Sequence, residues 1–452
     1  MEWRERVLDL SRSRGFRRMA LALVFVVLMW NGRRYPAGHG FDFGAHRDYT
    51  RFLRTHWRMP GYEDSRAAYN PPLFYLVGAS VMWANEELPG GPYTNSFKIL
   101  KMLLAVVAFA VVLVTMRIAG WILGEEAQTP FLLFLCSAPS FYRASAMYIP
   151  EQFLSLLIWT GFLVALRSWK TRGAVGWRAA AGCALLLCAA AWTRPLGFAA
   201  VGAWGLASVY LVARDGARRR AWLKSAGVIF CVCTLGCLTL FAFNYHRLGK
   251  VVPILPKVLK MQDVPLYRRQ PLSFYVGLEP GLLFSHPVRP VLGNRWMPVL
   301  YSDYWGDYWK YWTVDHEVEG LAEGFRVRML AAQNILAVLP TLLILSGLAA
   351  LGMGALRAGP GSPAAGFVPV GCLLLCGGLF FLYFIVGAPH DRTDNVKATY
   401  LCFLMPAAAM GGAHMLRCVL VRPGSRWFWL APYCLLFWLW SFVFLCVYVH
   451  HR

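Results

Sequence analysis

Two residues near the start of the chain could do acid–base chemistry together, because Asp42 and His46 lie four positions apart. Residues at this spacing share a face when the chain is helical, so a carboxylate and an imidazole would point to one side. A carboxylate within hydrogen-bond reach of a hydroxyl can take its proton as a general base. At a membrane surface such a pair is often only solvated, and the choice between the two interpretations depends on the motifs that accompany it.

Other ionisable residues stand at the ends of apolar tracts and not inside them. Glu151 opens one tract, Arg194 lies in a Thr-Arg-Pro sequence between two tracts, and Lys397 begins a Lys-Ala-Thr-Tyr sequence that ends at Tyr400. Arg and Lys at a membrane surface can neutralise a phosphate group without a nucleotide-binding motif. The alternative is ordinary contact with lipid headgroups at a helix end.

Glu151 has several roles open to it. Its carboxylate could hold an acceptor group, tune Asp42, or bind a divalent metal ion together with Asp42 and His46. Two carboxylates and an imidazole suffice for a zinc-type site if they converge. A structural hydrogen bond is an equal alternative, so the sequence leaves the cofactor open between none and a divalent metal ion.

Residues 301–309 form an aromatic string, Tyr-Ser-Asp-Tyr-Trp-Gly-Asp-Tyr-Trp, that includes Asp303 and Asp307. Tyr and Trp at this density are typical of a membrane surface, where a ring lies between lipid and water. We interpret the two aspartates as the polar members of this interfacial segment. The alternative is a part in closing over a substrate.

The composition of the chain indicates a lipid environment. Of its 452 residues 58% are hydrophobic and only 15% are charged, and the mean hydropathy is +0.46. Soluble proteins carry about 25% charged residues, so we expect an integral membrane protein without a large soluble catalytic domain. The formal net charge of +22 comes from short Lys/Arg clusters between apolar tracts, as in cytoplasmic loops, and nucleic acid is not an expected partner.

About a dozen apolar tracts predict an all-α polytopic membrane protein with about eleven transmembrane helices. The basic clusters assign the N-terminus to the cytoplasm. Residues 31–71 are then the first external loop, and residues 244–328 are a long external loop. The tracts cover residues 19–30, 72–84, 102–123, 130–146, 150–166, 179–192, 196–213, 221–243, 329–356, 366–388, 399–417 and 427–449.

The first external loop is predicted to contain an interfacial helix. Arg47, Arg51, Arg54 and Arg58 recur at helical spacing, and aromatic and aliphatic residues occupy another face. A basic face opposite an apolar face describes a helix that lies in the plane of the membrane surface. Pro60 is expected to end it.

The side of the membrane on which Glu151 lies depends on one short tract. Three candidate spans separate Asp42 from Glu151, which would put Glu151 inside, although the basic loop after it, residues 167–178, has the composition of a cytoplasmic loop. The conflict disappears if one of the three, such as residues 72–84, does not cross. We therefore expect Glu151 on the external side.

These motifs, in this order, resemble the GT-C glycosyltransferases that use polyprenyl-phosphate sugars, the group of the protein O-mannosyltransferases and the lipid A aminoarabinose transferase. The resemblance covers residues 42 to 400, most of the chain. Asn70 stands where many relatives have His or Lys before a double Pro, which leaves the role of this position open. The matching pieces are Asp42 with His46 and Tyr49, the Pro-Pro-Leu-Phe-Tyr stretch after Asn70, Glu151, Arg194, the aromatic string and the segment from Lys397 to Tyr400.

The resemblance implies a single GT-C domain over residues 1–452 that transfers a glycosyl group, with inversion, from a polyprenyl-phosphate sugar to an external glycolipid, polysaccharide or protein. It implies that Asp42 is catalytic, with Glu151 beside it, and that Arg194 and Lys397 bind the donor phosphate. The implied substrate-binding residues are His46, Tyr49, Asn70, Asp303, Asp307 and Tyr400.

Two other functions and two compartments stay open. A polytopic secondary transporter or a lipid-linked sugar flippase would also need about a dozen helices, although repeat symmetry and broken midplane helices are not evident. A third hypothesis is an inactive scaffold protein of the same fold. The Arg-rich, Lys-poor loops favour a bacterial inner membrane with the site facing the periplasm, and the endoplasmic reticulum membrane is the alternative.

Overall fold

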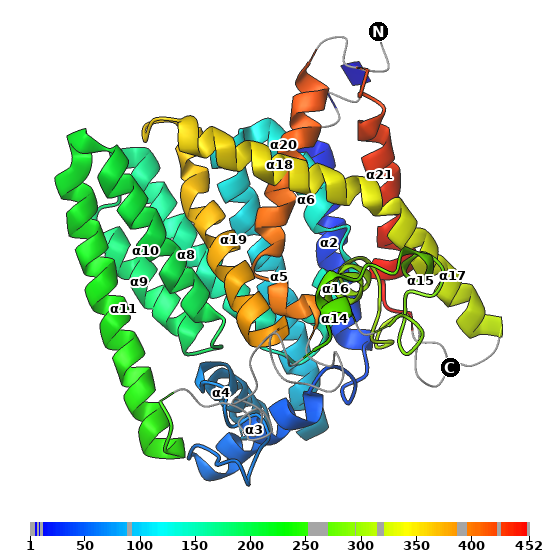
Figure 1. The fold of residues 1–452 in the computed structure, drawn as a ribbon. Helices are drawn as coiled ribbons and strands as arrows, with labels where there is room; N and C mark the ends of the chain where they lie inside the picture. The colour runs from blue at the N-terminus through cyan, green and yellow to red at the C-terminus, as the bar shows by residue number, and fades with distance from the viewer. Residues whose placement is uncertain are drawn as a thin grey trace.

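The computed structural model describes residues 5–6, 9, 12–87, 93–251, 270–293, 295–313, 321–386, 396–422 and 426–449. These residues form helices, turns and irregular connections, and no strand occurs among them. Figure 1 shows a bundle of long helices with shorter helices gathered at one of its ends. The all-α prediction is therefore confirmed for the part of the chain that is described.

Seven helical stretches of the described chain are long and apolar enough to cross a membrane, and three shorter apolar helices accompany them. This is a multi-pass membrane protein, while the expected number of about eleven crossings is not confirmed. The long helices are α2 (Arg14–Arg34), α5 (Tyr93–Leu123), α8 (Glu151–Arg172), α10 (Gly197–Arg214), α11 (Arg219–Leu248), α17 (Leu321–Leu336) running into α18 (Val338–Arg357), and α19 (Phe367–Phe381). The shorter ones are α9 (Trp177–Ala191), α20 (Met405–Val421) and α21 (Leu430–Ser441), which continues to Cys446.

The tract over residues 130–146 forms two short helices instead of one span. These are α6 (Gln128–Leu135) and α7 (Pro139–Ala146), and every residue of α7 is buried. Pro139 occupies the first turn of α7, where its missing N–H leaves no helical bond unmade, whereas inside one continuous helix it would break a bond. The chain is therefore broken between α6 and α7, and the polar side chains of α7 are buried in the bundle.

Helices α3 (Phe43–His56) and α4 (Leu73–Glu87) lie together at one end of the bundle (Figure 1). The predicted helix of the first external loop is present, although it ends at His56 and not at Pro60, with Trp57 in a left-handed conformation. Arg54 joins the two helices through ion pairs of 3.2 Å to Glu86 and 2.5 Å to Glu87. Helix α4 is not among the described helices that are long and apolar enough to cross a membrane.

Basic residues gather at the opposite end of the bundle. Arg12 forms an ion pair of 3.1 Å with Glu126, and Arg17 donates to the side chain of Gln128 at 2.6 Å. Arg218 donates to the carbonyl of Gly173 at 3.2 Å. The loops that the positive-inside rule assigns to the cytoplasm are thus neighbours in space.

The core of the bundle contains close helix contacts made by small residues. A side chain on Gly347 of α18 would overlap the carbonyl of Gly411 in α20, so only glycine allows these two backbones to approach. Elsewhere a buried indole joins distant segments, as Trp159 of α8 donates to the carbonyl of Phe403 at 2.9 Å. These contacts hold the helices that carry the site at fixed positions.

The remaining elements are short. The predicted long external loop, residues 244–328, includes the end of α11 and the start of α17, and its residues 252–269, 294 and 314–320 lie outside the described residues. Between α11 and α17 the described helices are α14 (Leu272–Val276), α15 (Pro280–Leu283) and α16 (Trp296–Trp305). Single turns occur at η1 (Glu125–Ala127), η2 (Gly216–Arg218), η3 (Pro363–Gly366), η4 (Leu382–Val386), η5 (Ala398–Leu401) and η6 (Phe442–Cys446).

Candidate functional site

Asp42 directly precedes α3 in a left-handed conformation, with φ of 53°, and its carboxylate makes no capping bond to the helix. The carboxylate instead accepts from Lys397, whose Nζ lies 3.0 Å from Oδ2. About half of the Asp42 side chain is exposed, at 53%, while that of Lys397 is 8% exposed. The pair therefore has a buried cation and a carboxylate that a substrate can reach.

The electrostatic surroundings keep both members of this pair charged. Burial alone would raise the pKa of Asp42, but Lys397 and then His46 outweigh it, and the pKa lies below its ordinary value. Burial alone would lower the pKa of Lys397, yet Tyr400 and Asp42 raise it above its ordinary value. The Lys397 ammonium also lies 4.8 Å from the ring centroid of Phe41 and 5.5 Å from that of Tyr400.

A second polar cluster joins Glu151, Arg194 and Asn70. Glu151 opens α8, and its Oε1 accepts from Nη2 and Nε of Arg194 at 2.5 and 3.2 Å. The third arm of the guanidinium, Nη1, donates to Oδ1 of Asn70 at 2.8 Å. All three side chains are buried, and Oε2 of Glu151 and Nδ2 of Asn70 have no partner among the described residues.

Tyr400 connects the two clusters. The guanidinium of Arg194 lies 5.3 Å from the centroid of its ring, and the ammonium of Lys397 lies 5.5 Å from the same centroid. Tyr400 lies in the turn η5, which begins directly after Lys397. Two cations from distant parts of the chain are thus assembled on one aromatic ring, as expected for a site that binds an anionic group.

His46 and Tyr49 lie beside the two clusters on an aromatic stack. Nδ1 of His46 is 2.7 Å from the hydroxyl of Tyr75, and the rings of Tyr49 and Tyr75 are stacked 3.9 Å apart. The Tyr49 hydroxyl accepts from Arg247 at 3.0 Å. Burial, and then repulsion by Arg194, lower the pKa of His46 to about 3, so the imidazole is neutral near pH 7.

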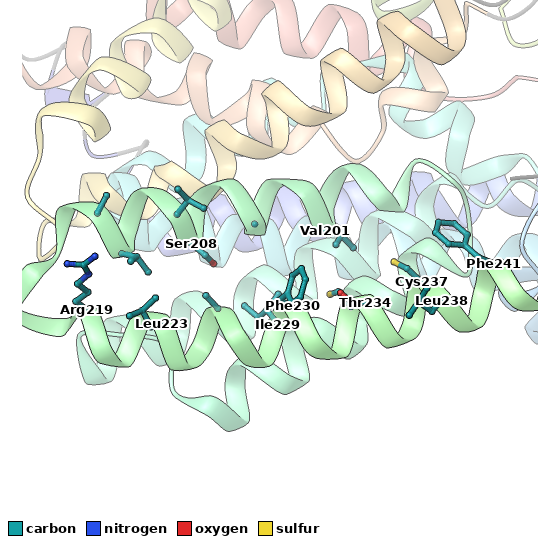
Figure 2. A pocket seen from close by; sticks show the side chains of 16 residues that line it. Val201, Ser208, Arg219, Leu223, Ile229, Phe230, Thr234, Cys237, Leu238 and Phe241 are labelled. Atoms are coloured by element: carbon teal, nitrogen blue, oxygen red, sulfur yellow. The ribbon is translucent and has the colours of Figure 1, made fainter. Parts of the chain in front are cut away.

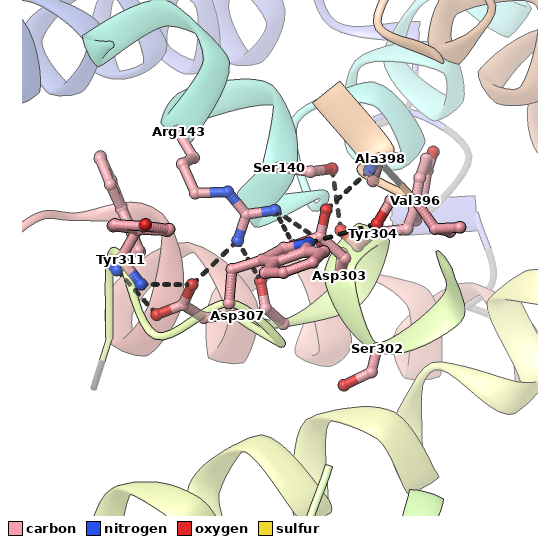
Figure 3. Close-up of polar contacts among 12 residues, drawn as sticks. Ser140, Arg143, Ser302, Asp303, Tyr304, Asp307, Tyr311, Val396 and Ala398 are labelled. Atoms are coloured by element: carbon pink, nitrogen blue, oxygen red, sulfur yellow. Dashed lines mark hydrogen bonds and ion pairs between the residues drawn. The ribbon is translucent and has the colours of Figure 1, made fainter. Parts of the chain in front are cut away.

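Asp303 and Asp307 are fully buried, unlike the polar members of an exposed interfacial segment, and both are bound to Arg143 of α7 (Figure 3). Arg143 donates to Oδ1 of Asp303 at 2.5 Å and to Oδ1 of Asp307 at 3.2 Å. The other oxygen of Asp303 accepts from the backbone N–H of Ala398 at 2.6 Å. Burial raises the pKa of Asp303 to about 6, and Arg143 opposes that rise.

This cluster fixes the segment that carries Lys397. Asp303 bonds directly to Ala398, one residue further along the chain, and Trp309 donates to the carbonyl of Val396 at 3.2 Å. Asp307 accepts from the backbone N–H groups of Tyr311, Trp312 and Thr313. Asp303 thus ties the aromatic string to the segment that carries Lys397, while Asp307 ties it to the residues that follow the string.

The carboxylates do not converge as a metal site. Among the described residues no three His, Cys, Asp or Glu side chains come close enough together to hold a metal ion. The Asp42 carboxylate pairs with Lys397, Glu151 pairs with Arg194, and His46 bonds to Tyr75. The expectation that Asp42, His46 and Glu151 could share a divalent ion finds no support here.

Two residues of this region are not among the site residues predicted from the sequence. Arg143 and Arg247 stand in no recognised motif, yet Arg143 holds the aromatic string, and Arg247 binds both the Tyr49 hydroxyl and the carbonyl of Ala68. Two aspartates that are buried require a cation, but the burial of Asp303 and Asp307 is visible only in the structure. The sequence did not indicate which cation.

Comparisons with known proteins give structural neighbours only. No protein-family profile matches the chain, and no curated protein sequence matches it. The archaeal oligosaccharyltransferase AglB of Archaeoglobus fulgidus, in complex with an inhibitory peptide and a dolichol-phosphate, superposes with a TM-score of 0.54 at 12% identity, over 97% of this chain and 56% of that protein. Its apo form gives the same TM-score and identity over 97% of this chain and 57% of that one.

A third neighbour is ArnT of Cupriavidus metallidurans bound to undecaprenyl phosphate, with a TM-score of 0.48 and 15% identity over 90% of this chain and 60% of that protein. The chain thus spans between 56% and 60% of the length of these three structures. The likeness to AglB shows the fold, which is of the GT-C type. The predicted fold class is confirmed.

Proposed function

We propose that this protein transfers a glycosyl group, with inversion, from a polyprenyl-phosphate sugar to an acceptor at the external membrane surface. The observation that carries the proposal is the ion pair of 3.0 Å between the accessible Asp42 carboxylate and the buried Lys397, with Arg194 on the same Tyr400 ring. This end of the bundle offers a base and two cations to a lipid phosphate. The dolichol-phosphate in the AglB structure of similar fold supports a donor of this class.

In the proposed reaction the Asp42 carboxylate and the cations Lys397 and Arg194 have different roles. The Asp42 carboxylate takes the proton of the acceptor hydroxyl as its oxygen attacks the anomeric carbon. The bond between that carbon and the phosphate oxygen breaks, and polyprenyl phosphate leaves with the electron pair. Lys397 and Arg194 stabilise the negative charge that develops on the phosphate.

Donor binding is proposed to switch on the base. In the absence of donor Lys397 lowers the pKa of Asp42, which makes its carboxylate a weak base. A phosphate that binds Lys397 competes with Asp42 for the ammonium group and so raises the pKa of Asp42 towards its ordinary value. The base is then strongest when the donor is in place.

The other residues of the site support these two roles. Glu151 is proposed to act through Arg194, since its carboxylate fixes two of the three guanidinium nitrogens. His46, Tyr49, Asn70 and Tyr400 are proposed to shape the surface that receives substrate. Asp303 and Asp307 are proposed as positioning residues for Lys397.

The acceptor is proposed to be a glycolipid, a polysaccharide or a protein on the external side, and the membrane to be a bacterial inner membrane with the site facing the periplasm. The basic residues gathered at the opposite end of the bundle support this orientation. A transport path would require charged groups near the bilayer midplane. The described ionisable clusters of this protein lie at the ends of helices instead.

The test uses purified protein in lipid nanodiscs with a panel of labelled polyprenyl-phosphate sugars and membrane extract as acceptor. Release of free polyprenyl phosphate, together with label in a product, is the expected result for at least one donor. Label that moves across the bilayer of a proteoliposome without cleavage of the donor would identify a flippase and contradict the proposal.

A further inference from the structure

A long apolar groove runs between α10 and α11, away from the site described above (Figure 2). Its volume is about 720 Å³, and its walls are mostly aliphatic and aromatic side chains of the two helices. Figure 2 shows Arg219 at one end of the groove and Phe241 at the other. Arg219 is the one charged residue of its lining.

Small residues of both helices open this groove. Gly205 of α10 and Ala226 of α11 belong to its lining, and a Cβ atom added to Gly205 would meet nothing within 4 Å. Larger side chains border it and are exposed on the outer surface of the bundle, among them Phe230 at 71% and Val209 at 69%. A groove of this kind on a membrane-spanning surface accepts a hydrocarbon chain without a change of the backbone.

The end at Arg219 carries positive charge that the described part of the protein does not neutralise. Arg219, Arg220 and Lys224 are all exposed, and among the described residues none of them has an acidic partner. The acidic residue nearest in sequence is Asp215, whose carboxylate already accepts from the backbone of Arg218 and from Trp222 at 3.2 and 3.0 Å. Basic pockets between helices at the cytoplasmic side bind anionic headgroups.

The polarity of the groove distinguishes it from a path for the donor lipid. The proposed donor phosphate binds at Arg194, which lies just before the first residue of α10, whereas Arg219 follows the last turn of that helix. A chain whose phosphate lies at Arg194 would bring only its apolar tail to the cation at Arg219. A lipid that fits must enter with its headgroup at the opposite end.

We propose that this groove binds an anionic phospholipid of the cytoplasmic leaflet, with its phosphate on Arg219 and an acyl chain between α10 and α11. The ligand matches both ends of the groove, because its negative headgroup meets the uncompensated cations and its chain covers the apolar walls. This site is separate from the proposed transferase site. Its test therefore does not depend on catalytic activity.

The experiment measures lipid binding by native mass spectrometry of the delipidated protein, titrated with phosphatidylglycerol or with phosphatidylcholine of the same acyl chains. Two variants alter the groove: Gly205→Leu fills part of its volume, and Arg219→Gln removes its positive charge. Each has a matched control, since Gly227 of α11 also has open space around it but does not line the groove, and Arg178 is an exposed arginine of α9. The controls are Gly227→Leu and Arg178→Gln, and size-exclusion profiles establish that every variant is folded.

Wild type is expected to bind phosphatidylglycerol more tightly than phosphatidylcholine. Arg219→Gln is expected to weaken phosphatidylglycerol binding about fivefold, the scale for one basic residue at a membrane surface. Gly205→Leu should weaken binding of both lipids, and the controls should leave binding unchanged. Equal affinity for the two lipids, or affinities that neither groove variant alters, would overturn the proposal. So would displacement of the bound lipid by polyprenyl phosphate, because the groove would then hold the donor tail.

Discussion

The ammonium nitrogen of Lys397 lies 3.0 Å from a carboxylate oxygen of Asp42, although 355 positions separate the two residues in the chain. This contact joins the residue before α3 to the segment that precedes α20. Lys397 thus pairs with the proposed base in the absence of donor and can pair with the phosphate of a bound donor. The predictions below follow from this relationship and from the clusters that surround it.

Replacement of Lys397 by Gln is expected to shift the pH dependence of turnover. Lys397 lowers the pKa of Asp42 in the protein without donor, so its removal raises that pKa, and the acidic limb of the kcat/KM profile moves to higher pH. Turnover at neutral pH should also fall about 10²-fold, because the leaving phosphate loses a cation. Lys310→Gln serves as the control, since Lys310 forms its ion pair with Glu323, outside the site. An acidic limb that stays in place in Lys397→Gln would contradict the coupling.

Removal of Arg194 is expected to destabilise the fold, because Glu151 then remains buried without a cation. Arg194→Met leaves the Glu151 carboxylate buried without its cation, which costs about 3–5 kcal/mol of the free energy of unfolding. The double variant Arg194→Met with Glu151→Gln should recover part of this loss, because no buried charge remains. Thermal unfolding in detergent measures both variants. Equal losses in the single and double variants would show that Glu151 does not depend on Arg194.

Arg143 is expected to control the backbone around Lys397. In Arg143→Met the Asp303 carboxylate loses its cation, and its bond of 2.6 Å to the N–H of Ala398 weakens. Hydrogen–deuterium exchange of a peptide that covers residues 396–402 should then become faster. Arg295→Met is the comparison, because Arg295 pairs with Glu279 in another part of the long connection. Unchanged exchange in Arg143→Met would remove Asp303 from the positioning of Lys397.

His46 is expected to make the protein less stable in acid. Its pKa is about 3 in the folded protein, well below the ordinary 6.5, so the unfolded chain binds a proton in this interval that the folded protein does not. The free energy of unfolding therefore falls as the pH is lowered from 6.5 towards 3, by up to about 1.4 kcal/mol per pH unit for one proton. His46→Gln should remove this part of the slope. Asp303 contributes with the opposite sign, but equally in both proteins, so its contribution cancels in the difference between their unfolding curves.

The sequence indicated which residues to place in the candidate site, but not their contacts. Glu151, Arg194 and Lys397 were identified in short motifs at the ends of apolar tracts, and Asp42 by the resemblance to the GT-C glycosyltransferases. Their pairing, Asp42 with Lys397 and Glu151 with Arg194, depends on how distant helices pack, and no local pattern carries that information. The same holds for Arg143, whose partner Asp303 lies 160 positions away.

The fold class was predictable because hydropathy reports burial in lipid directly. The number of crossings was not, since hydropathy does not distinguish a span from a buried short helix. Residues 72–84 lie in α4, which is shorter than the candidate spans, and residues 130–146 form α6 and α7 on either side of a break at Pro139. Asp303 and Asp307 were placed at the surface because their aromatic neighbours are typical of an interface, whereas their pairing with Arg143 allows them to be fully buried.

The most direct test of the proposed function compares wild type with Asp42→Asn in nanodiscs, with the polyprenyl-phosphate sugar that wild type uses. Asp48→Asn is the matched control, because Asp48 lies on α3 with its carboxylate 3.0 Å from the neighbouring Arg47 and partly exposed. Asp42→Asn should lower the release of polyprenyl phosphate at least about 10²-fold, the scale for loss of a general base, while Asp48→Asn keeps wild-type turnover. Turnover by Asp42→Asn equal to that of wild type would contradict the account and exclude Asp42 as the base.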